Sequence, residues 1–203
     1  MSKYTLVGST TSPFVRKLRI FMHYNNIPFE FKSINYMEAK DSEYLKSQNP
    51  LNKIPFLLID EKILFDSRVI YNFLSADLIQ KGLKHQDSLE DENATTEIDG
   101  FLETAVNLFA LRRGGLDIES KENSYVVRQK ERIELILNAL EKWILNDKKA
   151  TSWNYQTMSL YCALEWANFR EMITLSHRPV LVDFQTKFKT SPFVEETKII
   201  VPN

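Results

Sequence analysis

The N-terminal fold is decided by the stretch YTLVGSTTSPFVRK, residues 4–17. Its short apolar run, Tyr4–Val7, is typical of a strand, and Gly8 ends that run. Pro13 suits the first turn of a helix, and Ser12 just before it is a typical N-cap. A stripe at the spacing of one apolar helix face follows, made of Phe14, Leu18, Phe21 and Met22. The chain therefore opens with a predicted strand and a helix.

The next residues predict a small mixed sheet. A second strand is expected over residues 29–34 and a weaker helical patch over residues 39–47. Two apolar runs, residues 56–59 and 63–65, are joined by a short polar turn and predict a hairpin. A helix follows, with Ser67 as its expected N-cap. The opening strand, helix and strand imply a parallel pair, and the hairpin adds antiparallel strands.

The second half of the chain has the pattern of helices only. One helix is expected from near Asp87 to the glycines at 114 and 115, and others around residues 133–144 and 180–188. Residues 158–169 are apolar almost all round, which places their helix in the centre of a bundle. The polar stretch 80–93 is the predicted linker.

Composition excludes several classes of protein. The 203 residues carry 26 lysines and arginines against 27 acidic residues, a net charge of −1, so no overall field attracts nucleic acid or an anionic membrane. No apolar run reaches the roughly 18 residues of a membrane span. The N-terminus turns polar before a signal peptide could form. We therefore expect a cytoplasmic protein that binds neither nucleic acid nor membrane.

Cysteine and histidine, which are common metal ligands, are few in this chain and lie far apart. A single cysteine, Cys162, excludes an intramolecular disulfide and a multi-cysteine zinc site. The histidines, His23, His85 and His177, lack the spacing of metal ligands. Cys162 lies in the apolar helical stretch, so we expect a buried thiol and not a nucleophile. No metal is expected.

Four hydroxyl residues, Ser9 to Ser12, lie between the first predicted strand and helix. Ser12 is best placed to meet an anion, because the first amide hydrogens of a helix point outward at its N-terminus. A thiolate at this point would be stabilised by those amides and by the hydroxyl. The alternative is that Ser12 only caps the helix.

Two later segments also suit a ligand. Pro55 cannot donate to a strand ladder, so it marks the start or edge of a strand. If its peptide bond is cis, Ile54 presents its backbone N–H and C=O beside the sheet; the alternative is a rigid turn. Asp66 can pair with an ammonium group, and Ser67 with the helix amides can hold a carboxylate. The alternative is a helix cap beside a solvated acid.

In this order and spacing, the three segments resemble the N-terminal signatures of the glutathione transferase superfamily, particularly of small bacterial members with a serine at the start of the first helix. They are SPFVRK at residues 12–17, NPLNKIP at 49–55, and FDS at 65–67. CALEWANFR, residues 162–170, is similar to the buried sixth helix of those proteins, so the resemblance covers the whole chain. Asn52 stands where relatives commonly have glycine. Thr157 stands where they favour an acidic capping residue, which predicts a weakened cap.

The resemblance implies a thioredoxin-like α/β domain with a mixed four-stranded sheet over residues 1–80. It also implies an all-α helical bundle domain over residues 86–203, and a homodimer. Ser12 would donate a hydrogen bond to the sulfur of glutathione and lower the pKa of the thiol, although Thr11 is a second candidate for this hydroxyl. The expected glutathione-binding residues are Phe14, Lys53, Ile54, Pro55, Asp66 and Ser67.

Each of these residues has an implied role. Pro55 would be a cis-proline, and Ile54 would bond the cysteinyl backbone of the tripeptide. Asp66 and Ser67 would hold the γ-glutamyl ammonium and carboxylate, and Lys53 would assist at the glycyl carboxylate.

The function implied by the resemblance is that of a detoxifying glutathione transferase. Glutathione would be the co-substrate, and a small hydrophobic electrophile the second substrate, in conjugation, isomerisation or peroxide reduction. A non-catalytic protein-binding or regulatory member of the same fold is the alternative. A thiol reductase would need a reactive cysteine, which Cys162 is badly placed to supply.

Overall fold

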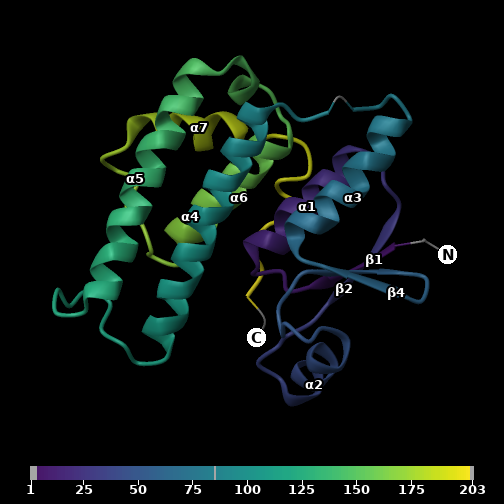
Figure 1. Ribbon diagram of the computed structural model, residues 1–203, viewed down its shortest axis with the longest axis horizontal. Coiled ribbons are helices and arrows are strands. Elements are labelled where there is room, and N and C mark those ends of the chain that lie inside the picture. Colours follow the sequence, from purple (N-terminus) through teal and green to yellow (C-terminus); the bar gives the residue numbers. More distant parts are fainter. Residues whose placement is uncertain (1–3, 85, 202–203) are drawn as a thin grey trace. The chain divides into compact units, whose positions relative to one another are not determined.

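The computed structural model describes residues 4–84 and 86–201, so His85 lies outside the described residues. Figure 1 shows strands and helices mixed in the first part of the chain, followed by helices. The first part contains β1 (Tyr4–Gly8), α1 (Pro13–Tyr24), β2 (Phe29–Ser33), α2 (Ala39–Gln48), β3 (Phe56–Ile59), β4 (Lys62–Phe65) and α3 (Ser67–Gln80). The second part contains α4 (Leu89–Arg113), α5 (Ser124–Asn146), the 3₁₀ helix η1 (Lys148–Thr151), α6 (Tyr155–Phe169) and α7 (Pro179–Phe188).

The four strands form one mixed sheet in the order β2-β1-β3-β4. β1 and β2 are parallel and are connected through α1. β3 is antiparallel to both of its neighbours, β1 and β4. The predicted parallel pair and hairpin are therefore confirmed, and with them the thioredoxin-like α/β part followed by helices.

Helices cover the sheet on both sides. α1 and α3 pack against each other, α1 also contacts β1, and α3 contacts β3 and β4. Figure 1 shows these two helices above the sheet and α2 below it. On the side of α2, Val7 and Phe56 form an apolar cluster with Leu45 and Ile34. The strand ends that carry the predicted site residues are thus fixed between two packed layers.

The chain divides into two compact units. The first unit is Met1–Gln86 together with Thr190–Asn203, and the second unit is Asp87–Lys189. The last residues of the chain therefore group with the α/β part. α3 ends at Gln80 and α4 begins at Leu89, so the connection is shorter than the predicted linker, because its second half forms the first turn of α4.

The second unit is a helical bundle in which α4 packs against both α5 and α6. α6 is buried on nearly all sides, as its apolar sequence predicts. Asn154 and Thr157 form a reciprocal capping box: the Thr157 amide donates to Asn154 Oδ1 over 3.0 Å, and the Asn154 amide donates to Thr157 Oγ1 over 2.9 Å. The predicted weakening of this cap is wrong, because the threonine hydroxyl accepts in place of a carboxylate. Among the described residues, no helix is long and apolar enough to cross a membrane.

Candidate functional site

The register of the sheet brings the three predicted site segments to one end of its strands, called the site edge below. At this end β1 and β4 finish and β3 begins. Val7 of β1 pairs with Phe56 of β3, and Phe56 pairs with Phe65 of β4, so the three form a row across the sheet. The loop after β1, the loop before β3 and the turn after β4 therefore leave the sheet at the same end. Segments that lie up to 55 positions apart in the sequence, from Ser12 to Ser67, therefore follow the strands at the same end of the sheet.

The hydroxyls of the loop after β1 have different partners. Ser9 Oγ and Thr11 Oγ1 are hydrogen-bonded to each other over 2.9 Å. Thr10 Oγ1 donates to the carbonyl oxygen of Ile200 over 2.6 Å. Ser12 is the N-cap of α1, as predicted, and its Oγ accepts from the backbone N–H of Val15 over 3.4 Å.

Ser12 has the features of an anion-binding hydroxyl. It is half-buried, and among the described residues no acceptor bonds its hydroxyl proton. The first turn of α1 contains no acidic side chain, so the partial positive charge of this helix end is not neutralised from within the helix. Phe14, also half-buried, follows at the second position of α1, and Lys17 Nζ lies 5.3 Å from the centre of its ring.

The loop before β3 is held by Asn49, whose side chain is buried. Its Nδ2 donates to the carbonyl oxygen of Lys53 over 2.8 Å, and its Oδ1 accepts from the Leu51 amide over 2.9 Å. Asn52 has a φ of 52°, a conformation that asparagine tolerates better than most residues. It therefore takes the left-handed backbone that glycine takes easily. The Ile54–Pro55 peptide bond is cis, and the side chain of Lys53 is exposed.

The turn after β4 differs from the prediction by one residue. Asp66, with a φ of 80°, is the N-cap of α3, and its Oδ1 accepts from the Arg68 amide over 2.8 Å. Ser67 is the first residue inside the helix and is 5% exposed, so the prediction of Ser67 as N-cap is wrong. The carboxylate of Asp66 is exposed and retains a second oxygen for a cationic group.

Sequence reasoning missed three residues that support the site edge. Asn49 is buried and bonds its own loop, and an asparagine just before a proline was a usable signal for such a turn. Arg16 is 1% exposed and donates from Nη2 to the carbonyl oxygen of Val194 over 3.1 Å. Thr10 bonds Ile200, 190 positions away, and no local pattern could have indicated that contact.

Cys162 is fully buried in α6, in agreement with the expected structural thiol. The described residues contain no group of histidine, cysteine and acidic side chains that could hold a metal ion.

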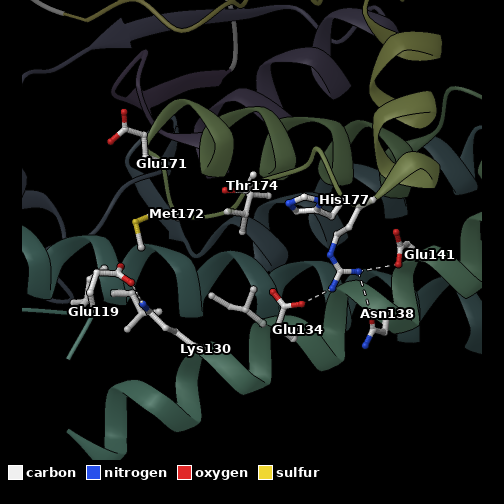
Figure 2. A pocket seen from close by; sticks show the side chains of 14 residues that line it. Glu119, Lys130, Glu134, Asn138, Glu141, Glu171, Met172, Thr174 and His177 are labelled. Atoms are coloured by element: carbon white, nitrogen blue, oxygen red, sulfur yellow. Dashed lines mark hydrogen bonds and ion pairs between the residues drawn. The ribbon is translucent and has the colours of Figure 1, made fainter. Parts of the chain in front are cut away.

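The second unit contains a hollow of about 650 Å³, shown in Figure 2. It lies between α5 and the segment that joins α6 to α7. Arg178 is held there by Asn138 and by two carboxylates, those of Glu134 and Glu141, over 2.5–3.0 Å. Its guanidinium is therefore engaged by carboxylates of the chain itself. The other polar lining residues include Glu119, Lys130, Glu171, Thr174 and His177. Such a polar lining does not match the apolar surface that a small hydrophobic electrophile needs.

By sequence, the chain is similar to glutathione S-transferases. Residues 6–77 match the family model described as glutathione S-transferase, N-terminal domain. The uncharacterized GST-like protein YibF of Escherichia coli (strain K12) is 30% identical over 172 residues, which cover 82% of this chain and 83% of YibF.

Solved structures of this kind share the fold. The glutathione S-transferase of Methylobacillus flagellatus KT, with GSH bound, matches with a TM-score of 0.81 and 22% identity, over 97% of this chain and 100% of that one. A glutathione S-transferase of Methylobacterium radiotolerans JCM 2831, in complex with glutathione sulfonate, matches with a TM-score of 0.81 and 19% identity, over 98% of this chain and 96% of that one. At these identities the likeness concerns the fold alone.

Proposed function

Because the chain belongs to the glutathione S-transferase superfamily, we propose that it is a glutathione transferase in which the Ser12 hydroxyl activates the thiol. The observation that carries the proposal is the hydrogen bonding of this hydroxyl. Its oxygen caps α1 by accepting from the Val15 amide, and within the described residues its proton is not donated to any acceptor. The Thr11 hydroxyl is paired with Ser9 instead, which favours Ser12 over Thr11 as the residue that faces the sulfur.

The chemistry follows from the position of Ser12. A sulfur placed beside it would accept a hydrogen bond from Oγ and would lie at the positive end of α1. Both interactions favour the thiolate over the thiol, so the pKa of the thiol falls and its proton passes to solvent. The thiolate lone pair then forms a bond to the electrophilic atom of the second substrate, and the electron pair of the broken bond leaves with the displaced group or stays on the adduct.

The rest of the tripeptide would occupy the site edge. The second oxygen of Asp66 suits the γ-glutamyl ammonium, and the amides at the start of α3 with the Ser67 hydroxyl suit its carboxylate. Ile54 would bond the cysteinyl backbone, Pro55 and Phe14 would form the wall of the site, and Lys53 would pair with the glycyl carboxylate. Two structures of the same fold contain glutathione or its sulfonate, which supports this ligand for the present chain.

In the same proposal the protein is a homodimer, and its second substrate is a small hydrophobic electrophile. Its role is detoxification and its location is the cytoplasm. One apolar face supports the dimer: Val69 and Phe73, one turn apart on α3, are 45% and 40% exposed. Apolar side chains at that spacing form a stripe that a second copy can cover.

The test measures binding and activation separately. Retention on immobilised glutathione and calorimetry report binding, and the ultraviolet difference absorbance of the thiolate near neutral pH reports activation. We expect the unchanged chain to give both signals, and Ser12→Ala to bind glutathione within about threefold while losing the thiolate signal. Thr11→Val is the matched control and should retain both.

Two outcomes would contradict the proposal. Binding with a thiolate signal that Ser12→Ala leaves unchanged would remove Ser12 as the activator. Failure of millimolar glutathione to bind or to raise the melting temperature would favour the non-catalytic, protein-binding alternative.

A further inference from the structure

The C-terminal segment, residues 190–201, lies along α1 within the first unit. Phe193 stacks on the ring of His23 with centroids 5.3 Å apart, at the C-terminal end of α1. Ile200 accepts the hydrogen bond from Thr10, at the N-terminal end of the same helix. The segment therefore runs antiparallel to α1 and ends beside the loop that carries Ser12.

Between these two ends, arginines of α1 hold the segment through its backbone and side chains. Arg16 donates to the carbonyl oxygen of Val194 over 3.1 Å and to Thr197 Oγ1 over 3.4 Å. Arg19, one turn further along, donates to the carbonyl oxygen of Glu196 over 3.4 Å. Thr197 is itself fully buried and donates to the carbonyl oxygen of Phe193 over 2.6 Å. The segment is thus held against α1 as part of the first unit.

Two contacts to this segment lie on either side of Ser12. Thr10, two residues before Ser12, bonds Ile200, and Arg16, four residues after it, bonds Val194 and Thr197. The backbone links these positions closely, because the Ser12 amide donates to the Ser9 carbonyl and the Arg16 amide donates to the Ser12 carbonyl.

The cap bond of Ser12 alone fixes its hydroxyl weakly. The distance from the Val15 nitrogen to Ser12 Oγ is 3.4 Å, longer than the usual 2.7–3.2 Å of an N–H···O hydrogen bond. The Thr10 bond, at 2.6 Å, is the shorter of the two and joins the loop to a segment that α1 already holds. Small displacements of a reacting group reduce rates strongly, so the placement of this loop matters for chemistry at Ser12.

We propose that Thr10 is a positioning residue, and that its hydrogen bond to Ile200 of the C-terminal segment sets the placement of the Ser12 hydroxyl against the glutathione sulfur. This inference rests on the proposed function. Thr10 acts through the loop and the C-terminal segment, and Ser12 remains the group that contacts the sulfur.

The experiment compares Thr10→Val, which removes the donor and keeps the volume, with Thr10→Ser, which keeps the donor. The readouts are the pKa of bound glutathione, from the pH titration of the thiolate absorbance, and the kcat and KM for a general electrophile such as an activated aryl halide. We expect Thr10→Val to raise the pKa of the bound thiol and to lower kcat roughly fivefold, the scale of one net hydrogen bond, with little change in the KM for glutathione. Thr10→Ser should restore both values.

A second variant tests the route through the C-terminal segment. A chain that ends at Ile199 should reproduce the effect of Thr10→Val, and the two changes together should cost no more than either alone. Thr96→Val is the matched control, since it removes a comparable exposed hydroxyl-to-carbonyl bond in α4, and it should leave the thiol pKa unchanged.

The possible results distinguish a failure of the proposed role of Thr10 from a failure of the proposed function. If the unchanged chain forms the thiolate and Thr10→Val behaves as the unchanged chain does, the inference is wrong and the proposed function stands. Failure of Thr10→Ser to rescue, or additive effects of Thr10→Val and the shortened chain, also overturns it. If the unchanged chain forms no thiolate, both are overturned.

Discussion

A β-carbon added at Gly8 would lie 2.3 Å from Cγ2 of Val15, so the end of β1 and the first turn of α1 approach too closely for any other residue at position 8. Val15 is fully buried, and its β-branched side chain has little freedom to turn away. Gly8→Ala should therefore reduce the free energy of unfolding by about 1–3 kcal/mol, the usual cost of overpacking. The measurement is chemical unfolding, or a fall in Tm of several degrees.

Gly100 supplies the control for that substitution. A β-carbon at this position in α4 would meet its nearest atoms, from Arg132 and Ile136, at 3.6 and 3.8 Å, which is ordinary contact. Since glycine inside a helix is less favourable than alanine, Gly100→Ala should raise stability by up to about 1 kcal/mol. Equal Tm values for Gly8→Ala and the unchanged chain would show that the first turn of α1 moves without cost.

Asn49→Ala should weaken both the fold and the binding of glutathione. The substitution removes the two hydrogen bonds that join Asn49 to Leu51 and Lys53, inside the loop that leads to Ile54. A typical hydrogen bond contributes about 0.5–1.5 kcal/mol net, so loss of the two should reduce the free energy of unfolding by about 1–3 kcal/mol. Urea unfolding gives the stability and calorimetry gives the affinity. Asn52→Gly, which preserves the left-handed backbone, should leave the affinity unchanged; an equal loss in both variants would contradict a specific role of Asn49.

Acid should remove a stabilising contribution of Asp91 in the second unit. Burial alone would raise the pKa of this carboxyl, but hydrogen bonds from Lys149 and from the amide and hydroxyl of Ser88 outweigh it and lower the pKa. Because the folded-state pKa lies below the ordinary value of about 4, the contribution is present above that value and is lost as pH falls. The stability difference between the unchanged chain and Asp91→Asn should be largest near pH 7 and should shrink below about pH 4.

A substitution of Lys149 distinguishes the protonation of Asp91 from the protonation of other carboxyl groups. Its pKa is raised, first by the hydrogen bond to Asp91, so it stays charged throughout the acid range and its own contribution is lost only at high pH. Thermal unfolding of Lys149→Met at several pH values should therefore show a smaller acid-dependent loss than the unchanged chain. The same acid dependence in all three proteins would assign the loss to other carboxyls.

Phe73→Glu should dissociate the proposed dimer. The substitution places a charge on the exposed apolar stripe of α3, where a second copy would have to desolvate it. Sedimentation velocity should give a dimer for the unchanged chain and a monomer for the variant. Asn72→Glu adds the same charge at the adjacent exposed position, off the stripe, and should remain dimeric; a monomeric unchanged chain would refute the prediction directly.

The layout of the fold could be predicted because its signals are local and periodic. The apolar face of α1, the hairpin before α3 and the all-apolar α6 each have a spacing that belongs to one kind of element. The error at Ser67 has a different origin. Aspartate and serine are both common N-caps, so the sequence pattern does not choose between Asp66 and Ser67, and in the structure the Asp66 carboxylate accepts from the Arg68 amide.

The site was also predictable in part, because its segments follow from the predicted order and pairing of the strands. Strand pairing places the segments of Ser12, Ile54 and Asp66 at the site edge, and pairing follows from topology. Whether these residues bind glutathione stays a prediction. The contact between Thr10 and Ile200 could not be predicted, because its partners are 190 positions apart and belong to no repeating pattern.

The division of the first unit into two pieces of chain has a consequence for biosynthesis. Residues 87–189 are made before the C-terminal segment, so the ribosome completes the whole helical unit before it supplies the partners of Thr10 and Arg16. Residues 4–65, which supply all four strands of the sheet, are made earlier still, before the segment that contacts α1. The contacts of Thr10 and Arg16 with residues 190–201 can therefore form only after residues 87–189 have been made.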